Sequence, residues 1–583
     1  MSVPPDRARE ALGGFNPDGQ PTYQWRLTSA NLIDPVRLVL PPTKVLPVIF
    51  VPGIMGSNLM DMNRNKVWRL DTTFGAPVGL ARKMAFSGAA TRQRLMHPSQ
   101  TQVDPRGGIP GTPIGSVGRK DQYRDERFWG EIAEGSYHSF LLWLEERLNS
   151  GEYNPAKWQE FFYTAVSAAP RPGERPPEPR LGPGIQMQMR GFNPAGYVDR
   201  DGSGTPAMHE PVTSDDLLKR AKFRMPVYAC GYNWLASNTA AAERLRDRIQ
   251  HVINSYSRNG FKCDQVVLIT HSMGGLVARR CALLPGMQDK IAGVVHGVMP
   301  AVGAAVAYRR CKIGMRDEDF VAGLVIGSNG REVTAVFSQA PGALQLLPTA
   351  EYRAGWLKVQ SADGVTADEV RPVGDPYNDI YLRRDRWWGL VREEWLSPRG
   401  GRPLSWDQFA MNIRISRSFH EQILGEYHPV TYVYYGADRD QASFETVRWK
   451  MRAGLRPDSR TPPSAQQVYD MDFDQVRDDG SNPLHVGGRM EVATGYGYMG
   501  GGATTYQTSY WELEAQKQDG GGDGTVPVSS GEAPLRHAKN RGSIRQQFRM
   551  SGFAHEPSYR DGQAQLATLF SLQKIAAQAK IPA

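Results

Sequence analysis

The chain reads Val266-Val267-Leu268-Ile269-Thr270-His271-Ser272-Met273-Gly274-Gly275 at the point that decides its fold class. The aliphatic run predicts a buried strand, and the small residues after Ser272 predict a sharp turn into a helix that continues through Leu284. A turn of this kind, a nucleophile elbow, holds its serine on strained backbone with the hydroxyl above the sheet. Thr270 departs from the usual pattern, which has glycine two residues before the serine. The alternative is that Ser272 only caps the following helix.

Strands and helices alternate on both sides of this stretch. Such alternation implies right-handed crossovers, and therefore a mostly parallel sheet with helices on both faces. A helix at residues 239–258 places apolar side chains on one face, and a closing helix is expected at 563–579. Short apolar runs predict the remaining strands of the sheet at residues 45–51, 227–230, 291–295 and 430–435.

Insertions divide the predicted core. Residues 45–303 and 428–583 are expected to form it, after an N-terminal extension at residues 1–44. Proline-rich sequence predicts a surface excursion near residues 160–215, because proline removes backbone donors. The alternation fails at residues 304–427, which we interpret as a cap or lid insertion.

Composition excludes several classes of protein. With 40% hydrophobic and 22% charged residues, the 583-residue chain has enough apolar surface to fold. Its formal charge of +9 is a mild excess that identifies no anionic partner. The four cysteines have no CxxC spacing, so neither a disulfide scaffold nor a zinc module is expected. The N-terminus has no apolar stretch of the kind a signal peptide needs, and no nucleic-acid-binding motif is present, so no nucleic-acid partner is expected.

A serine that transfers acyl groups needs backbone donors for the oxyanion. The amide of Met273, directly after the nucleophile, is the first candidate. The second is the amide of Ile54, in a loop where Gly53 and Gly56 allow the backbone to turn its amides inward. An ordinary glycine-rich turn is the alternative for this loop.

The serine also needs a histidine base and an orienting carboxylate, in the chain order serine, acid, histidine. We predict Asp523, exposed between glycines, as the acid, and His555, in a late loop before the closing helix, as the base. His537 is the competing base. Asp438 and Asp440 compete as the acid, because they follow a predicted strand.

Two neighbouring features have other interpretations. The sequence Asp519-Gly-Gly-Gly-Asp523-Gly resembles a calcium loop, but a single copy is weak evidence, and no cofactor is expected. His271, beside the nucleophile, is interpreted as a turn or packing residue rather than a second base.

Several segments together resemble lecithin:cholesterol acyltransferase-like lipases and GPI inositol-deacylase-like α/β-hydrolases. Within that superfamily the chain looks most like the lipase effectors delivered by type VI secretion. The resemblance implies an α/β-hydrolase fold and hydrolysis of phospholipid acyl esters through an acyl-enzyme at Ser272. The segments that carry it, in chain order, are Val51–Ser57, Gly231–Leu235, Thr270–Gly275, Tyr434–Gly436 and Gly522–Pro527.

The resemblance also implies partners and a location. Such an effector attacks membrane phospholipid in the periplasm of a rival cell, is exported by a secretion apparatus without a cleavable signal, and is neutralised by an immunity protein. Tryptophans beside Arg383, Arg384 and Arg386 could rest at a lipid headgroup boundary, or could simply pack a cap domain. An acyltransferase of the same fold, and a non-catalytic membrane- or nucleic-acid-binding protein, remain the alternatives.

Overall fold

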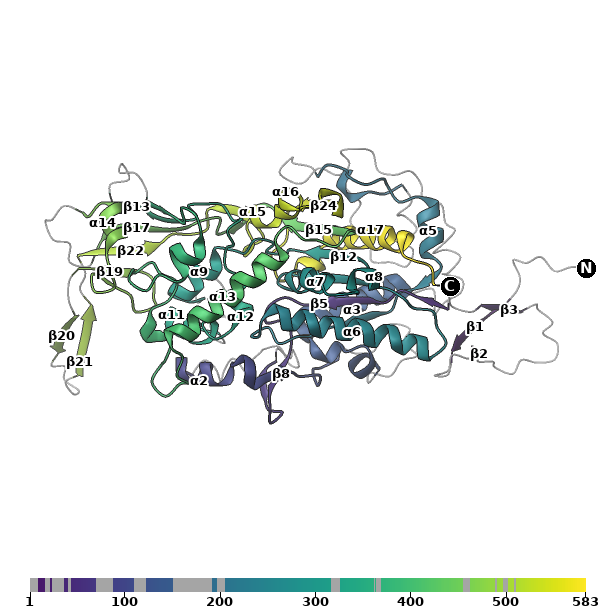
Figure 1. The fold of residues 1–583 in the computed structure, drawn as a ribbon, viewed down its shortest axis with the longest axis horizontal. Coiled ribbons are helices and arrows are strands. Elements are labelled where there is room, and N and C mark those ends of the chain that lie inside the picture. Colours follow the sequence, from purple (N-terminus) through teal and green to yellow (C-terminus); the bar gives the residue numbers. More distant parts are fainter. Residues whose placement is uncertain are drawn as a thin grey trace, which may run out of the picture.

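The computed structural model describes two regions that lie side by side along the long axis of the molecule (Figure 1). One is built on a parallel sheet and the other on a mixed sheet. Among the described residues no helix is both long and apolar enough to cross a membrane. Most of the predicted surface excursion lies outside the described residues. These are residues 9–15, 21–23, 36–39, 43–69, 87–109, 122–149, 191–196, 205–315, 326–360, 362, 369–454, 462–487, 490–495, 502–507 and 510–582.

The parallel sheet has six strands in the order β10-β5-β11-β12-β15-β24. Every neighbouring pair is parallel, and Thr270 lies in register with Val51 on one side and His296 on the other. The carboxyl ends of the three central strands therefore meet at one edge. The bounds are β10 Val227–Ala229, β5 Val48–Val51, β11 Val266–His271, β12 Ile291–Gly297, β15 Thr431–Gly436 and β24 Ile544–Met550.

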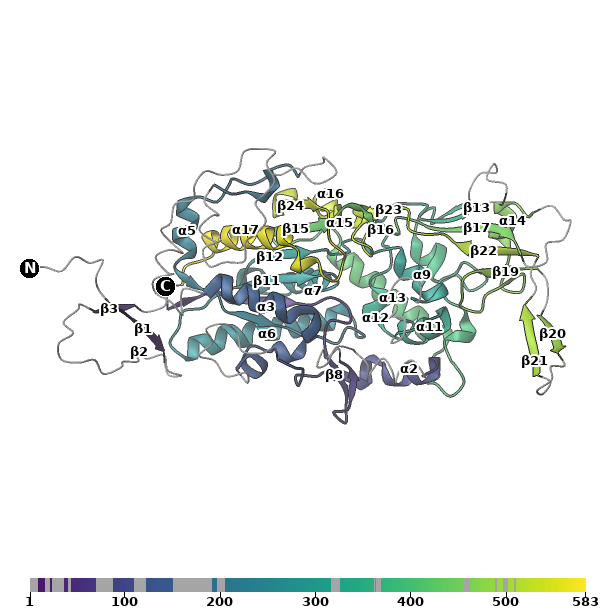
Figure 2. The ribbon, with the colours of Figure 1, turned by 180° about the vertical axis from the view of Figure 1, so that it is seen from behind.

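Helices cover both faces of this sheet (Figures 1 and 2). Successive side chains of a strand point to opposite faces, so Val267 and Ile269 join one apolar cluster while Val266 and Leu268 join the other. The predicted α/β-hydrolase arrangement, a mostly parallel sheet between two helical layers, is confirmed. The first cluster contains α3 (Glu134–Asn149) and α17 (Gly562–Gln578), and the second contains α6 (Asn238–Arg258) and α7 (Gly274–Ala282).

The second region draws on two separate parts of the chain. Its mixed sheet has the order β14-β13-β17-β22-β19-β18, and β13 pairs in parallel with β17. The last four of these strands fall within residues 428–583, which we assigned to the core, so the insertion is not one continuous block. The strands are β14 Glu369–Arg371, β13 Leu357–Gln360, β17 Val447–Ala453, β22 Trp511–Ala515, β19 Leu484–Val486 and β18 Val476–Arg477. Helices α9 (Val306–Ile313), α11 (Gly330–Phe337), α12 (Pro341–Leu344), α13 (Trp406–Ile423) and α14 (Ala465–Asp470) complete it.

Tryptophans form much of the core of this second region. Trp356, Trp387 and Trp388 are buried at 0–1% exposure. The indole N–H of Trp387 donates to the carbonyl of Val468, and that of Trp388 to the carbonyl of Tyr469. Side chains so enclosed cannot rest at a lipid headgroup boundary, so for these three the packing alternative is the correct one.

Candidate active site

The turn after β11 is strained as an elbow requires. Ser272 has a φ of 52°, in the left-handed region that residues with a side chain rarely adopt. Its amide donates to the carbonyl of Gly297 at 2.9 Å, which fixes the turn on the end of β12. A Cβ at Gly274 would lie 2.4 Å from the carbonyl oxygen of Val51, so only glycine allows α7 to start so close to β5.

Thr270, where the sequence departs from the usual glycine, is accommodated by a partner on the next strand. Its hydroxyl lies 2.9 Å from Nδ1 of His296, and both side chains are buried. Burial, assisted by the charge of Arg279, lowers the pKa of His296 to about 3. A neutral imidazole therefore shares the hydrogen bond, and the threonine oxygen is not left unsatisfied in the core.

The predicted serine, histidine and aspartate lie within hydrogen-bond distance of one another. Nε2 of His555 is 2.9 Å from Oγ of Ser272, and Nδ1 is 2.8 Å from Oδ2 of Asp523. An ionised carboxylate can only accept, so Nδ1 carries the proton and Nε2 is left to accept the serine proton. The aspartate side chain is 1% exposed and that of the histidine 15%, so the acid is shielded while the base remains accessible.

Asp523 is itself held by its own loop. Its second oxygen, Oδ1, accepts the amides of Thr525 at 3.0 Å and Val526 at 2.7 Å. The fully buried hydroxyl of Ser443 accepts the amide of Gly524 at 3.0 Å. Sequence reasoning missed Ser443, because nothing in the sequence indicates that a serine 80 residues earlier supports this loop.

The competing acids and base lie elsewhere. Asp438 accepts the amides of Asp440, at 2.8 Å, and of Gly552, also at 2.8 Å, so it supports the loop before His555 without reaching the imidazole. His537 ends α16 (Ala533–His537), where its carbonyl lies close to Gly425.

The two acids of the possible calcium loop, Asp519 and Asp523, face protein groups and do not point toward a shared site. The carboxylate of Asp519 accepts the hydroxyl and the amide of Thr446 and lies 3.6 Å from the guanidinium of Arg448. Asp523, four residues later, faces His555 instead. Across the described ranges no group of three His, Cys, Asp or Glu side chains is placed to hold a metal ion.

The loop after β5 lies directly against the nucleophile. A Cβ at Gly53 would lie 3.0 Å from Cβ of Ser272 and from Nδ1 of His271, so a side chain there would crowd the elbow. Within the described part of the chain, nothing accepts from the amides of Ile54 or Met273. Both predicted oxyanion donors are thus free beside the serine.

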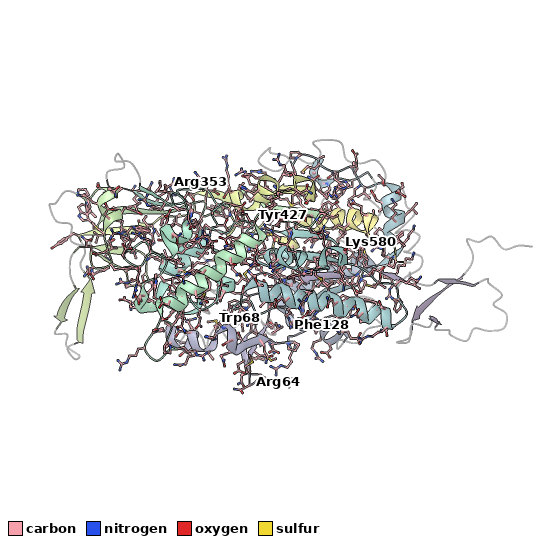
Figure 3. The ribbon with its side chains drawn as sticks, viewed as in Figure 1. Arg64, Trp68, Phe128, Arg353, Tyr427 and Lys580 are labelled. Carbon is pink, nitrogen blue, oxygen red and sulfur yellow. The ribbon has the colours of Figure 1, made fainter. Side chains whose placement is uncertain are left out.

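Two side chains from other segments of the chain, Tyr232 and Trp68, fix this loop. The hydroxyl of Tyr232 donates to the carbonyl of Pro52 at 2.9 Å. Trp68, labelled in Figure 3, donates its indole N–H to the carbonyl of Met55 at 2.7 Å. The carbonyl of Gly53, in the same peptide unit as the amide of Ile54, accepts the amide of Gly56 at 3.1 Å, so the loop cannot readily rotate this free amide away from the serine.

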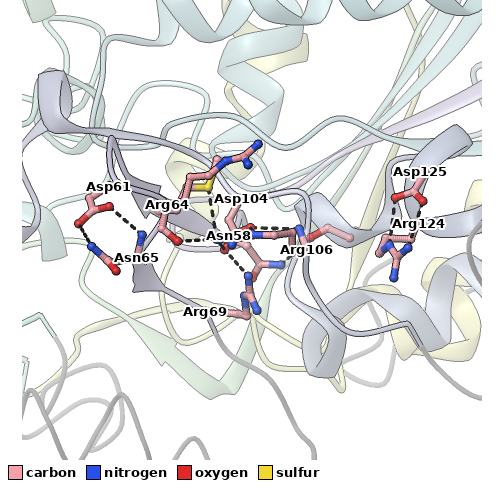
Figure 4. Close-up of polar contacts among 11 residues, drawn as sticks. Asn58, Asp61, Arg64, Asn65, Arg69, Asp104, Arg106, Arg124 and Asp125 are labelled. Carbon is pink, nitrogen blue, oxygen red and sulfur yellow. Dashed lines mark hydrogen bonds and ion pairs between the residues drawn. The ribbon is translucent and has the colours of Figure 1, made fainter.

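A polar network braces the chain just beyond the loop (Figure 4). The buried side chain of Asn58 donates to the carbonyls of Gly130, at 2.9 Å, and Ile132, at 3.0 Å. The amide of Asp104 donates to the carbonyl of Asn58, and its carboxylate pairs with Arg106 at 2.8 Å. The network ties the end of the loop to the segment that leads into α3.

A comparison with protein-family models finds a match for the segment that contains the elbow. Residues 232–312 match the model of the PGAP1-like alpha/beta domain. No curated protein gives a significant match to the sequence. Ser272 and Met273 lie inside the matched segment, whereas Ile54, Asp523 and His555 lie outside it.

One solved structure extends the likeness to nearly the whole chain. Over 92% of its length the chain resembles 99% of a chain in the crystal structure of the Tle4-Tli4 complex, with 27% identity and a TM-score of 0.69. Phospholipase PlaB from Legionella pneumophila matches 40% of this chain and 66% of its own at 12% identity. Its TM-score of 0.14 supports no inference. The likeness to this solved structure thus extends well beyond residues 232–312 and covers both regions of the fold.

Proposed function

We propose that the chain is a serine ester hydrolase of the phospholipase A type. The observation that carries this proposal is the continuous hydrogen-bonded set Ser272, His555 and Asp523, with free amides at Ile54 and Met273 beside the serine. A nucleophile, a base oriented by an acid, and two donors are the parts that acyl transfer requires.

The reaction proceeds in two halves. Oγ of Ser272 attacks the ester carbonyl carbon as its proton passes to Nε2 of His555, and the amides of Ile54 and Met273 stabilise the oxyanion. The intermediate collapses, His555 protonates the leaving alcohol, and a lysophospholipid departs from an acyl-enzyme. Water then attacks the acyl-enzyme and gives its proton to His555, which returns it to Oγ of Ser272 as the bond to the acyl carbon breaks and the fatty acid leaves.

We propose further that this hydrolase is an antibacterial toxin of the type VI lipase effector kind. Its likeness to a chain of the Tle4-Tli4 complex supports a dedicated partner protein that neutralises it in the producing cell. Export without a cleavable signal peptide, through a secretion apparatus, would bring it to membrane phospholipid in the periplasm of a target cell.

Fatty acid release from phospholipid vesicles tests the proposal. The wild-type protein is expected to release free fatty acid and lysophospholipid, and Ser272→Ala is expected to release neither. Adding an alcohol acceptor distinguishes hydrolysis from acyl transfer, because a transferase would form a new ester in place of fatty acid. Equal release by both proteins would refute the assignment of Ser272.

A further inference from the structure

His271, the residue before the nucleophile, connects the two loops that complete the site. Its Nε2 lies 3.0 Å from the carbonyl oxygen of His555, and its Nδ1 lies 3.1 Å from the hydroxyl of Tyr137. The same hydroxyl receives the amide of Gly53 at 3.2 Å. One chain of hydrogen bonds thus runs from the oxyanion loop through α3 and the elbow to the base loop.

The direction of each hydrogen bond follows from the groups at the ends of the chain. A carbonyl oxygen only accepts, so Nε2 of His271 carries the ring proton and Nδ1 must accept. Tyr137 therefore donates to Nδ1, and its oxygen remains available to the amide of Gly53. No member of this chain can reverse without leaving a buried donor or acceptor unpaired.

The imidazole of His271 stays neutral in this position. It is 4% exposed, and the rings of Tyr137, Tyr559 and His555 surround it with centroids 5.2–5.6 Å away. Burial, assisted by the charge of His555, lowers its pKa to about 3. A second cation therefore does not form beside the imidazolium of His555 during the reaction.

The backbone of His555 is held from both sides. Its amide donates to the carbonyl of Asp523 at 2.7 Å, and its carbonyl accepts from His271. Because the ring is also bound at both nitrogens, only small displacements of this residue are possible without breaking a hydrogen bond. Reacting groups misplaced by about 1 Å can cost about 100-fold in rate.

We propose that His271 and Tyr137 are positioning residues. They fix the loop that carries Ile54 (the oxyanion loop) and the loop that carries His555 (the base loop) relative to each other on either side of Ser272. Neither touches the ester, and each acts through the backbone of Gly53 or His555. This inference rests on the proposed function, since it assigns roles within the same site.

The test uses the full-length protein and a soluble short-chain ester, with kcat and KM measured separately. Tyr137→Phe and His271→Leu should lower kcat about 10- to 100-fold with KM within about threefold. His271→Gln should recover at least about fivefold over the leucine variant, because its amide nitrogen can reach the His555 carbonyl.

A double variant and a matched control separate positioning from packing. Tyr137→Phe combined with His271→Leu should lose less than the product of the two single losses, because the tyrosine acts on His555 only through His271, and its contact with Gly53 alone remains to be lost. Phe140→Leu, in the same aromatic cluster but without a polar contact, should lower the unfolding temperature and leave kcat of the folded protein unchanged. The proposal would be overturned if the loss of kcat in the double variant equalled the product of the two single losses, or if Tyr137→Phe left kcat unchanged.

Failure of the proposed function would be distinguishable. If the protein cleaves soluble esters but not phospholipid, the substrate assignment fails and the kinetic test of positioning still applies. If it cleaves neither, 15N spectra of the histidine-labelled protein test the positioning role. The signals of one neutral imidazole protonated at Nε2 should be absent from His271→Gln, and the signals of His555 should shift in Tyr137→Phe. Unshifted His555 signals would reject the positioning role.

Discussion

Replacing Asp523 by asparagine tests how much of the catalytic rate depends on the orientation and tautomer of His555. The side chain keeps its size, but one oxygen becomes an NH₂ group. In the native site Oδ2 faces Nδ1–H of His555, and Oδ1 accepts the amides of Thr525 and Val526.

Both orientations of the new amide are costly. With its NH₂ toward the two backbone amides, two hydrogen bonds to a charged acceptor are lost, at about 1.5–3 kcal/mol each. With its NH₂ toward His555, the imidazole must place its proton on Nε2 and cannot accept from Ser272. The second orientation keeps the fold intact, so we expect it, together with a loss of about 10⁴-fold in kcat, as for the wrong histidine tautomer in serine proteases.

The assay is release of fatty acid under saturating substrate, with thermal unfolding measured beside it. We expect a loss of about 10⁴-fold in kcat, with an unfolding temperature close to that of the wild type. Asp438→Asn is the matched control, since its carboxylate supports Gly552 and does not reach the imidazole, and it should lose less than about tenfold. A loss below tenfold for Asp523→Asn would refute the role of this acid.

Three further predictions concern stability. Gly274→Ala should cost about 1–3 kcal/mol and lower the unfolding temperature, because the new Cβ would lie 2.4 Å from the Val51 carbonyl, whereas Gly374→Ala, with open space around it, should change little. Lys312→Met should cost about 3–5 kcal/mol in urea unfolding, because it leaves Asp478 buried and unpaired, and adding Asp478→Asn should restore part of the loss. Four buried histidines with pKa values lowered to about 3 or 4 stay neutral in the folded state, whereas the unfolded chain takes up their protons below about pH 6.5. Stability should therefore fall by up to about 5 kcal/mol per pH unit between pH 6 and 4, and equal urea midpoints at pH 7.5 and 5 would contradict this. These histidines are His138, His271, His296 and His420.

The core of the fold could be predicted because its signals are local. The elbow is specified by a buried strand of six residues followed by a serine and two glycines. The parallel sheet is specified by the alternation of strands and helices. The predicted helix at 239–258 matches α6, Asn238–Arg258, almost residue for residue. Ser272, Asp523 and His555 could be selected because chain order and glycine-flanked loops restrict the choice.

Long-range pairing could not be predicted in the same way. β13 pairs with β17, although the core strand β15 lies between them in the sequence. No local pattern in Leu357–Gln360 or Val447–Ala453 specifies that partner. The contacts of Tyr137 with Gly53 and His271 span 84 and 134 residues. A tyrosine on the buried face of a helix is typical of core packing, so only the three-dimensional arrangement indicates its polar role.

Labelling with a fluorophosphonate tests the central claim most directly, because this reagent traps an activated serine hydroxyl without requiring the natural substrate. We predict a single adduct on the peptide that contains Ser272, with labelling greatly slowed in His555→Ala. An adduct on another serine, or equal labelling in the absence of the imidazole, would contradict the proposed chemistry.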